Sequence, residues 1–200
     1  SIPVASAVTN RSVLAGCEGF DCIDRYLRIP DSAFTWKDTG LRLRGTAPDT
    51  GVACTLHVLR MTSQTWLRGV STKPKWVHHV VLVEPENLLK GGPKSGWASL
   101  ILGDTMFVSE QLLAAQPDAN MKVAMGLATR LGALSAVLYG VPNEFNIFSD
   151  DPIHQGALLQ EDEKAYSWMH VIEHPNKPEF MVELPNVKSV VRGMDVLQNY

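Results

Sequence analysis

The chain has 200 residues, of which 45% are hydrophobic and 20% charged, and its formal net charge at pH 7 is −3. These proportions are those of an ordinary folded domain, and 200 residues are enough to bury a core. The small negative charge argues against nucleic acid or an anionic membrane as a main partner, because both require a basic face.

The first 23 residues have features of an exported protein. Cys17 and Cys22 lie close together in a loop, and their spacing predicts a small disulfide, with Cys54 free or bonded to another segment. Three reduced cysteines are the alternative, because spacing alone does not fix pairing. Asn10 starts an Asn-Arg-Ser triplet that fits the glycosylation pattern. We expect a protein of the secretory-pathway lumen or a secreted one, with its signal peptide removed.

Residue periodicity predicts that the first half of the chain is mostly strands. A short helix within 24–30 ends before a proline. Alternating apolar residues then predict strands at 34–44 and 52–64, joined by a Pro- and Gly-containing turn. Two further strands are predicted at 76–83 and 97–102. Antiparallel neighbours are therefore expected at the start of the sheet.

The second half alternates between helix and strand. A helix is predicted at 120–131, with Gly132 as its C-cap, and a buried strand at 134–139. The apolar stretch 123–141 contains Arg130 and three glycines, which argue against a membrane span. Helix followed by apolar strand is typical of a parallel sheet.

The last segment, 185–200, predicts an amphipathic helix. Its apolar residues follow the spacing of a core-facing element: Val187, Val190, Val191, Met194 and Leu197. Such a face requires a sheet or another helix to pack on.

Several short motifs occur between residues 24 and 200. They include Phe34-Thr35-Trp36, Thr62 to Trp66, Val137 to Glu144, Tyr166 with Trp168, and Leu184 to Lys188. As a set, these motifs resemble the PhoPQ-activated pathogenicity-related proteins, a family that includes the autocrine proliferation repressors.

The resemblance implies an α/β-hydrolase-like fold with a mixed sheet, antiparallel at its start and parallel in its later strands. In that family a Gly-Ala-Ser-Lys-Arg-Gly-Trp type nucleophile turn follows the helix that matches 186–199. The 200 residues contain neither this turn nor a G-x-S-x-G motif. We therefore expect 1–23 to be an extension and 24–200 to be the N-terminal part of a hydrolase-like domain. A further segment or a second polypeptide would complete it and supply the nucleophile, acid and base.

The resemblance also places a possible oxyanion loop at Gly103, Asp104 and Thr105, after the fourth predicted strand. The family's stretch is richer in glycine, and a carboxylate opposes a developing anion, so a turn that caps a helix is the alternative.

His78 and His79 are adjacent on a predicted strand. They face opposite sides of the sheet and cannot share one role.

His170, Glu173 and His174 fit the H-x-x-E-H pattern, in which two histidines one helical turn apart bind zinc. Pro175 ends the helix at once, so an exposed helix end is the favoured interpretation. The acidic runs 150–151 and 161–163 are predicted to cap helices, and calcium coordination is the less favoured alternative because the EF-hand spacing is absent. No cofactor is expected, and catalysis itself is left open. Three functions remain as alternatives. The favoured one is part of a hydrolase-like protein, the second is a non-catalytic signalling, binding or structural protein, and the remote third is a zinc protease.

Overall fold

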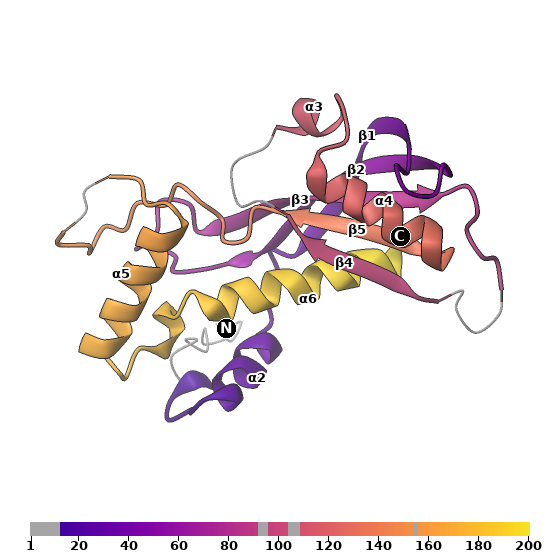
Figure 1. The fold of residues 1–200 in the computed structure, drawn as a ribbon. Helices are drawn as coiled ribbons and strands as arrows, with labels where there is room; N and C mark the ends of the chain where they lie inside the picture. The colour runs from indigo at the N-terminus through magenta and orange to yellow at the C-terminus, as the bar shows by residue number, and fades with distance from the viewer. Residues whose placement is uncertain (1–12, 92–95, 104–108, 154–155) are drawn as a thin grey trace, which may run out of the picture.

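The computed structural model describes residues 13–91, 96–103, 109–153 and 156–200, and Figure 1 shows their arrangement around one mixed sheet. The strands lie in the order β1-β2-β3-β5-β4. Their bounds are β1 Thr35–Thr46, β2 Ala53–Thr65, β3 Lys75–Pro85, β4 Ala98–Leu102 and β5 Leu134–Tyr139. Neighbours from β1 to β5 are antiparallel, whereas β4 and β5 are parallel. The α/β class, with an antiparallel start and a later parallel pair, is confirmed.

Strand β2 shows why the sheet has two apolar faces. Leu56 and Val58 are fully buried in one cluster, and Leu59 and Met61 are fully buried in another. Successive residues of a strand point to opposite faces of the sheet. A strand with apolar residues on both faces therefore requires an element packed on each face.

Helix α4, Ala119–Leu131, covers the face that carries Leu56 and Val58. Its first turn is capped by Asp118, whose carboxylate accepts from the Met121 N–H at 2.8 Å. Gly132 ends the helix with a left-handed φ of 60°, as expected for a C-cap glycine. The predicted helix and cap are confirmed. In the described parts of the chain, no helix has both the length and the apolarity needed to cross a membrane.

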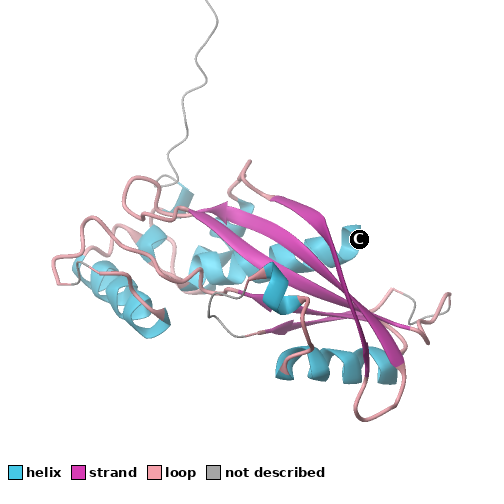
Figure 2. Cartoon of the chain, turned by 90° about the horizontal axis from the view of Figure 1, so that it is seen from above, coloured by secondary structure: helices cyan, strands magenta, loops and turns pink. Residues whose placement is uncertain are grey.

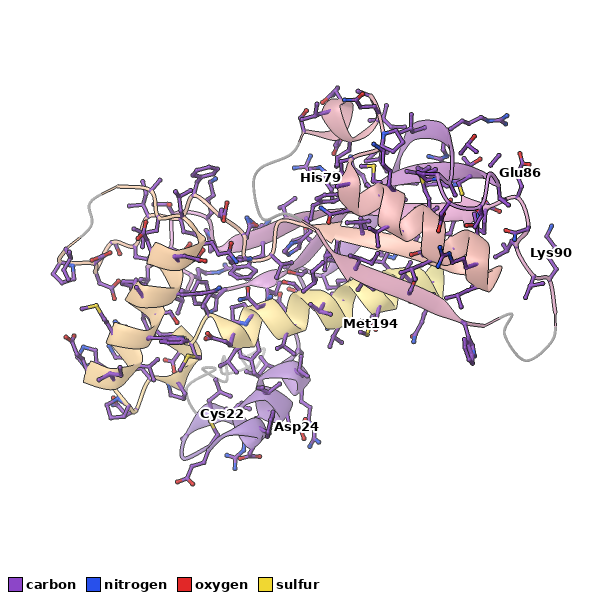
Figure 3. The ribbon with its side chains drawn as sticks, in the orientation of Figure 1. Cys22, Asp24, His79, Glu86, Lys90 and Met194 are labelled. Atoms are coloured by element: carbon purple, nitrogen blue, oxygen red, sulfur yellow. A yellow bond between two sulfur atoms is a disulfide. The ribbon has the colours of Figure 1, made fainter. Side chains whose placement is uncertain are left out.

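Helix α6, Glu183–Asn199, covers the opposite face (Figures 1 and 2). Its existence is confirmed, but its predicted apolar face was only partly right. Val190 and Leu197 do pack on the sheet, whereas Met194 is 48% exposed and points away from the sheet in Figure 3. The buried residues are Leu184, Pro185, Lys188, Ser189, Gly193 and Val196.

Helix α6 is thus rotated about its axis relative to the prediction, and the polar partners of its buried side chains explain this orientation. The Lys188 ammonium donates to the Ile29 carbonyl at 2.8 Å and lies 5.1 Å from the centre of the Tyr26 ring. At Gly193 the helix approaches the sheet closely, since a Cβ there would lie 3.1 Å from a Leu100 methyl group. A pattern of apolar residues carries no information about such partners.

The remaining elements gather at one end of the sheet. They are α2 Phe20–Arg28, α5 Gln160–Glu173 and the 3-10 helix η1 Pro178–Phe180, while the short α3 Glu110–Leu113 lies beside α4. Helix α2 begins four residues before the predicted start. An aromatic cluster joins these elements to the sheet through Tyr26, Trp66, Trp76, Phe148, Tyr166 and Phe180.

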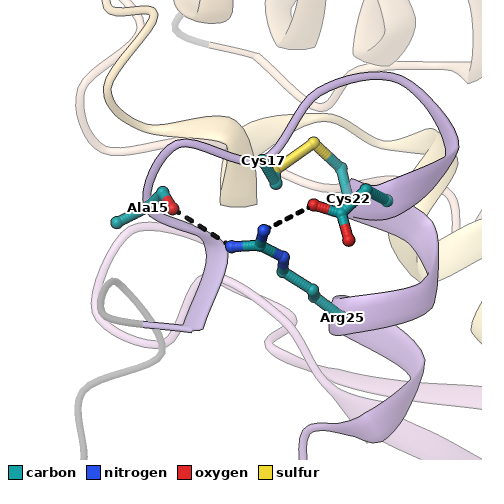
Figure 4. The surroundings of a disulfide bond; sticks show 5 residues. Ala15, Cys17, Cys22 and Arg25 are labelled. Atoms are coloured by element: carbon teal, nitrogen blue, oxygen red, sulfur yellow. Dashed lines mark hydrogen bonds and ion pairs between the residues drawn. A yellow bond between two sulfur atoms is a disulfide. The ribbon is translucent and has the colours of Figure 1, made fainter.

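Cys17 and Cys22 form a disulfide just before and within α2, which confirms the predicted pairing (Figure 4). Arg25 closes the same loop, donating to the Ala15 carbonyl at 3.2 Å. Cys54 is a free, buried thiol, and burial raises its pKa. The predicted glycosylation site at Asn10 lies outside the described residues.

Candidate functional site

A cleft of about 750 Å³ opens where β5 ends and β3 begins. It is lined by Arg60, Thr72, Lys73, Pro74, Lys75, Val77, His79, Ser109, Glu110, Gln111, Tyr139, Gly140, Asn143 and Glu144. In open α/β sheets, ligands bind beyond the carboxyl ends of the parallel strands. This cleft is therefore the candidate functional site.

The turn after β5 shapes one wall of the cleft. Gly140 has a φ of 80°, in the left-handed region that favours glycine. Three residues later, the Asn143 side-chain oxygen accepts from the Val77 N–H at 2.6 Å. This bond ties the turn to the start of β3, so the wall has a fixed position relative to the sheet.

His79 lies on the cleft side of β3 and is labelled in Figure 3. Its Nε2 is 3.5 Å from a Glu110 carboxylate oxygen, and Arg60 reaches the same oxygen at 3.8 Å. Burial lowers the pKa of His79, and Glu110 opposes this shift. Near neutral pH this ring is uncharged and can accept or donate one hydrogen bond in the cleft.

His78 faces the other side of the sheet, as predicted. Its Nε2 lies 2.8 Å from the Ser63 hydroxyl, which in turn is 3.0 Å from the Ser189 hydroxyl of α6. Burial lowers the pKa of His78 to about 4. Ser63 is 0% and His78 1% exposed, so no substrate reaches this serine–histidine pair. The pair therefore serves to attach α6 to the sheet.

Gly103 follows β4 and lies against the cleft residue Tyr139. A Cβ at Gly103 would be 2.7 Å from the Tyr139 ring and 2.8 Å from Val137, so no side chain fits there. The Gly103 N–H already donates to the Leu138 carbonyl at 2.9 Å, which removes it as an oxyanion donor. The other two residues of the expected loop, Asp104 and Thr105, lie outside the described residues, and their role stays a prediction.

A profile of the PhoPQ-activated pathogenicity-related proteins matches residues 25–200. The chain belongs to this family. The sequence resemblance is thereby confirmed over almost the whole described fold, including every strand and every element that lines the cleft.

Among curated relatives, this PhoPQ-related chain is similar to autocrine proliferation repressor protein A of Dictyostelium discoideum. The two are 24% identical over 186 residues, which cover 89% of this chain and 32% of the relative. The chain thus spans about a third of the length of the curated relative that it matches. No solved structure matches it.

The zinc-like triplet of this PhoPQ-related chain is not assembled into a metal site. His170 stacks on Phe180, with ring centres 3.6 Å apart, and His174 lies beside it at 4.9 Å. Burial lowers the pKa of His170. Within the described ranges, no group of three or more His, Cys, Asp or Glu, Glu173 included, could hold a metal ion.

Sequence reasoning missed two buried carboxylates, of which Glu144 lines the cleft and Glu163 lies near Glu144. Glu144 is 8% and Glu163 0% exposed, and each has one carboxylate oxygen without a hydrogen-bond partner. The other Glu163 oxygen accepts from the Asn146 amide at 3.1 Å. Burial raises the pKa of Glu163 to about 8, and the Glu144 charge adds to the shift. A usable signal existed, because Glu163 and Tyr166 lie three residues apart on one helix face.

The capping prediction for the acidic runs was wrong where it can be tested. The residue before α5 is Leu159, which makes no side-chain cap, and 161–163 lie inside the first turn. Asp150 instead accepts from the Tyr166 hydroxyl, and Asp151 accepts from the Ile153 N–H at 2.8 Å. Helix α5 starts at Gln160, too far along the chain for residues 150–151 to cap it. The Asp150 and Asp151 carboxylates instead stabilise the loop before α5.

Proposed function

We propose that this chain forms the N-terminal part of a hydrolase-like catalytic domain in an exported protein. The cleft at the end of β5 is the substrate site of that domain, and the nucleophile comes from a segment outside these 200 residues or from a second polypeptide. The observation that carries the proposal is the position of the cleft, at the carboxyl end of a parallel strand pair and beside Gly103.

The edge of the sheet supports a further strand. β4 is the last strand in the order, and in the described part of the chain no strand pairs with its outer edge. Leu102 on this strand is 54% exposed. An uncovered edge with apolar side chains is a surface that another strand normally covers. Since this chain aligns with only 32% of its curated relative, the family has ample length to supply one.

Helix α6 has the direction that such a strand requires. In its first turn, the Pro185 carbonyl accepts from the Gln64 side-chain amide at 2.7 Å. At the other end of the helix, the Tyr200 hydroxyl lies 2.7 Å from His57 Nδ1, nearer the start of β2. The helix therefore runs from the carboxyl end of β5 toward its amino end. A strand that follows this helix and lies beside β4 is parallel to β4 and ends next to the cleft. In hydrolases of this type, the nucleophile occupies the turn after such a strand.

Export is the expected setting of this domain. The Cys17–Cys22 disulfide encloses a short loop, and such bonds persist in oxidising compartments. Glycosylation at Asn10 belongs to the same proposal, and mass spectrometry of protein from a secreting host tests both. A reduced Cys17–Cys22 pair and an unmodified Asn10 would contradict export.

Labelling of the full-length protein with a fluorophosphonate tests the catalytic proposal. We expect one serine outside residues 1–200 to be labelled, and we expect the His79→Asn variant to change the labelling rate. His57→Asn is the matched control, because His57 lies away from the cleft beside Tyr200. Native mass with and without reductant shows whether the labelled serine is on the same chain. Absence of labelling in a folded full-length protein would overturn the proposal.

A second candidate is a non-catalytic regulator of proliferation, which the name of the curated relative favours. The two candidates make different predictions for a full-length variant whose labelled serine is changed to alanine. A catalytic protein loses its biological effect with this change, whereas a regulator that acts by binding still slows the growth of its own cells. Growth curves with added purified protein separate the two.

A further inference from the structure

The charges that line the cleft differ in how far a ligand can reach them. Three cationic side chains lie at its surface: Lys73 and Lys75 are exposed, and the Arg60 side chain is 51% exposed. This concentration of positive charge contrasts with the formal net charge of −3 for the whole chain. A cleft whose reachable charges have one sign attracts ligands of the opposite sign.

Of the described residues that line the cleft, two are acidic, and both are engaged or buried. The Glu110 carboxylate faces both His79 and Arg60, at 3.5 and 3.8 Å. Glu144 is 8% exposed, and its free carboxylate oxygen is fully covered. Neither carboxylate is placed to repel an anion that enters from solvent. Among the described lining residues, the cations therefore set the sign of the charge that a ligand meets.

The cationic groups also have free donors. The Lys73 ammonium donates to the Glu144 carbonyl at 3.4 Å and lies 5.7 Å from the centre of the Phe145 ring. This contact uses one of its three donors and holds the side chain at the cleft wall. Arg60 meets Glu110 at 3.8 Å, a separation that leaves most of its five N–H groups for other partners.

We propose that the cleft binds ligands that carry an anionic group, a carboxylate or a phosphate, which Lys73 and Lys75 contact directly while Arg60 contributes at the inner side. As a statement about substrates, this inference rests on the proposed hydrolase-like function, and the substrates it implies are esters with an acidic group near the scissile bond. As a statement about binding, it depends on the cleft alone.

Titration calorimetry on the full-length protein tests the binding statement. The probes are succinate, inorganic phosphate and the neutral analogue succinamide, each at low and at physiological salt. We expect one of the two anions to bind at least tenfold more tightly than succinamide, with an affinity that falls as salt is added. Which anion binds distinguishes a carboxylate site from a phosphate site.

The double variant Lys73→Met, Lys75→Met locates the effect. We expect it to weaken anion binding about tenfold or more, because a charge-assisted hydrogen bond is lost at each position. The matched control is Lys37→Met with Lys122→Met, which removes the same charge from exposed positions outside this cleft. Equal weakening by both double variants, or equal binding of succinamide and the anions, would overturn the inference.

Matched ester substrates separate this inference from the proposed function. If the protein is labelled by fluorophosphonate but hydrolyses an acidic and a neutral ester equally well, with or without the two lysines, the function stands and the inference fails. A second outcome is that no labelling occurs, that anions bind, and that the Lys73→Met, Lys75→Met variant selectively weakens anion binding. In that case the cleft is an anion-binding site, and the catalytic proposal fails.

Discussion

The buried carboxylate of Glu163 predicts a specific dependence of stability on pH. This side chain is 0% exposed, and a single side-chain hydrogen bond, from Asn146, compensates for its burial. Burial, with the nearby Glu144 charge, raises its pKa from 4.5 to about 8. In the folded chain Glu163 is therefore protonated at neutral pH, whereas in the unfolded chain it is ionised.

The sign and size of the effect follow from this difference. Because the folded-state pKa is the higher one, the contribution of Glu163 to the unfolding free energy is fully present below about pH 4.5. It is lost as the pH rises toward about 8. A gap of about 3.5 between the two pKa values, at 1.36 kcal/mol each, corresponds to about 5 kcal/mol over this window.

The Glu163→Gln variant removes the titration while keeping the shape of the protonated side chain. We expect it to match the parent within about 1 kcal/mol near pH 5 and to exceed it by about 4 kcal/mol near pH 8, as the linkage predicts. Urea unfolding from pH 5 to 8, followed by tryptophan fluorescence, measures the difference. Glu161→Gln is the control on the same helix, since Glu161 is 80% exposed.

A constant difference between the Glu163→Gln variant and its parent from pH 5 to 8 would refute this reasoning. It would mean that Glu163 has the same pKa in the folded and unfolded chains, and that its burial is compensated in another way. A pH dependence of the same size for Glu161→Gln would also refute it, because the Glu161 side chain is 80% exposed and burial cannot be the cause there.

Three further variants test the fold around the cleft. Gly103→Ala places a methyl group 2.7 Å from the Tyr139 ring, so we expect a loss of about 1–3 kcal/mol in urea unfolding; an unchanged midpoint would contradict the close approach. Asp118→Ala removes both the cap of α4 and a 2.6 Å bond from the Tyr139 hydroxyl, at a cost of about 1–2 kcal/mol. Replacing Cys17 and Cys22 by serine opens a short loop and lowers thermal stability by about 2 kcal/mol, whereas an unchanged melting temperature would show that the bond contributes nothing.

The strands, helix α4 and its Gly132 cap were predictable from sequence because each depends on local residues. Apolar residues on both faces of β2 require two covered faces, and a glycine after an apolar helix marks its end. The orientation of α6 was predicted only in part. Its packing depends on Lys188 and Gly193, whose partners at Ile29 and Leu100 lie far away in the sequence.

The candidate site was less accessible to sequence reasoning than the fold. Gly103 was correctly placed after a strand, but its amide is engaged by Leu138, a pairing set by the neighbouring strand. The cleft combines Arg60 of β2 with Glu110 of α3, residues 50 positions apart in the sequence. No local pattern brings these together. Only the family resemblance drew attention to the loop after β4, which lies beside the cleft.

The contacts beneath α6 make its packing selective as well as stable. Apolar contacts are not directional. A helix whose buried face is entirely apolar can therefore rotate about its axis at a small cost in free energy. A shift of one residue turns a helix by about 100° and would separate the Lys188 ammonium from the Ile29 carbonyl and the Ser189 hydroxyl from the Ser63 hydroxyl. Each such loss costs about 1–3 kcal/mol, and more for the charge. Competing arrangements of the same sheet and helix are thereby penalised, and the polypeptide discriminates among them by hydrogen bonding.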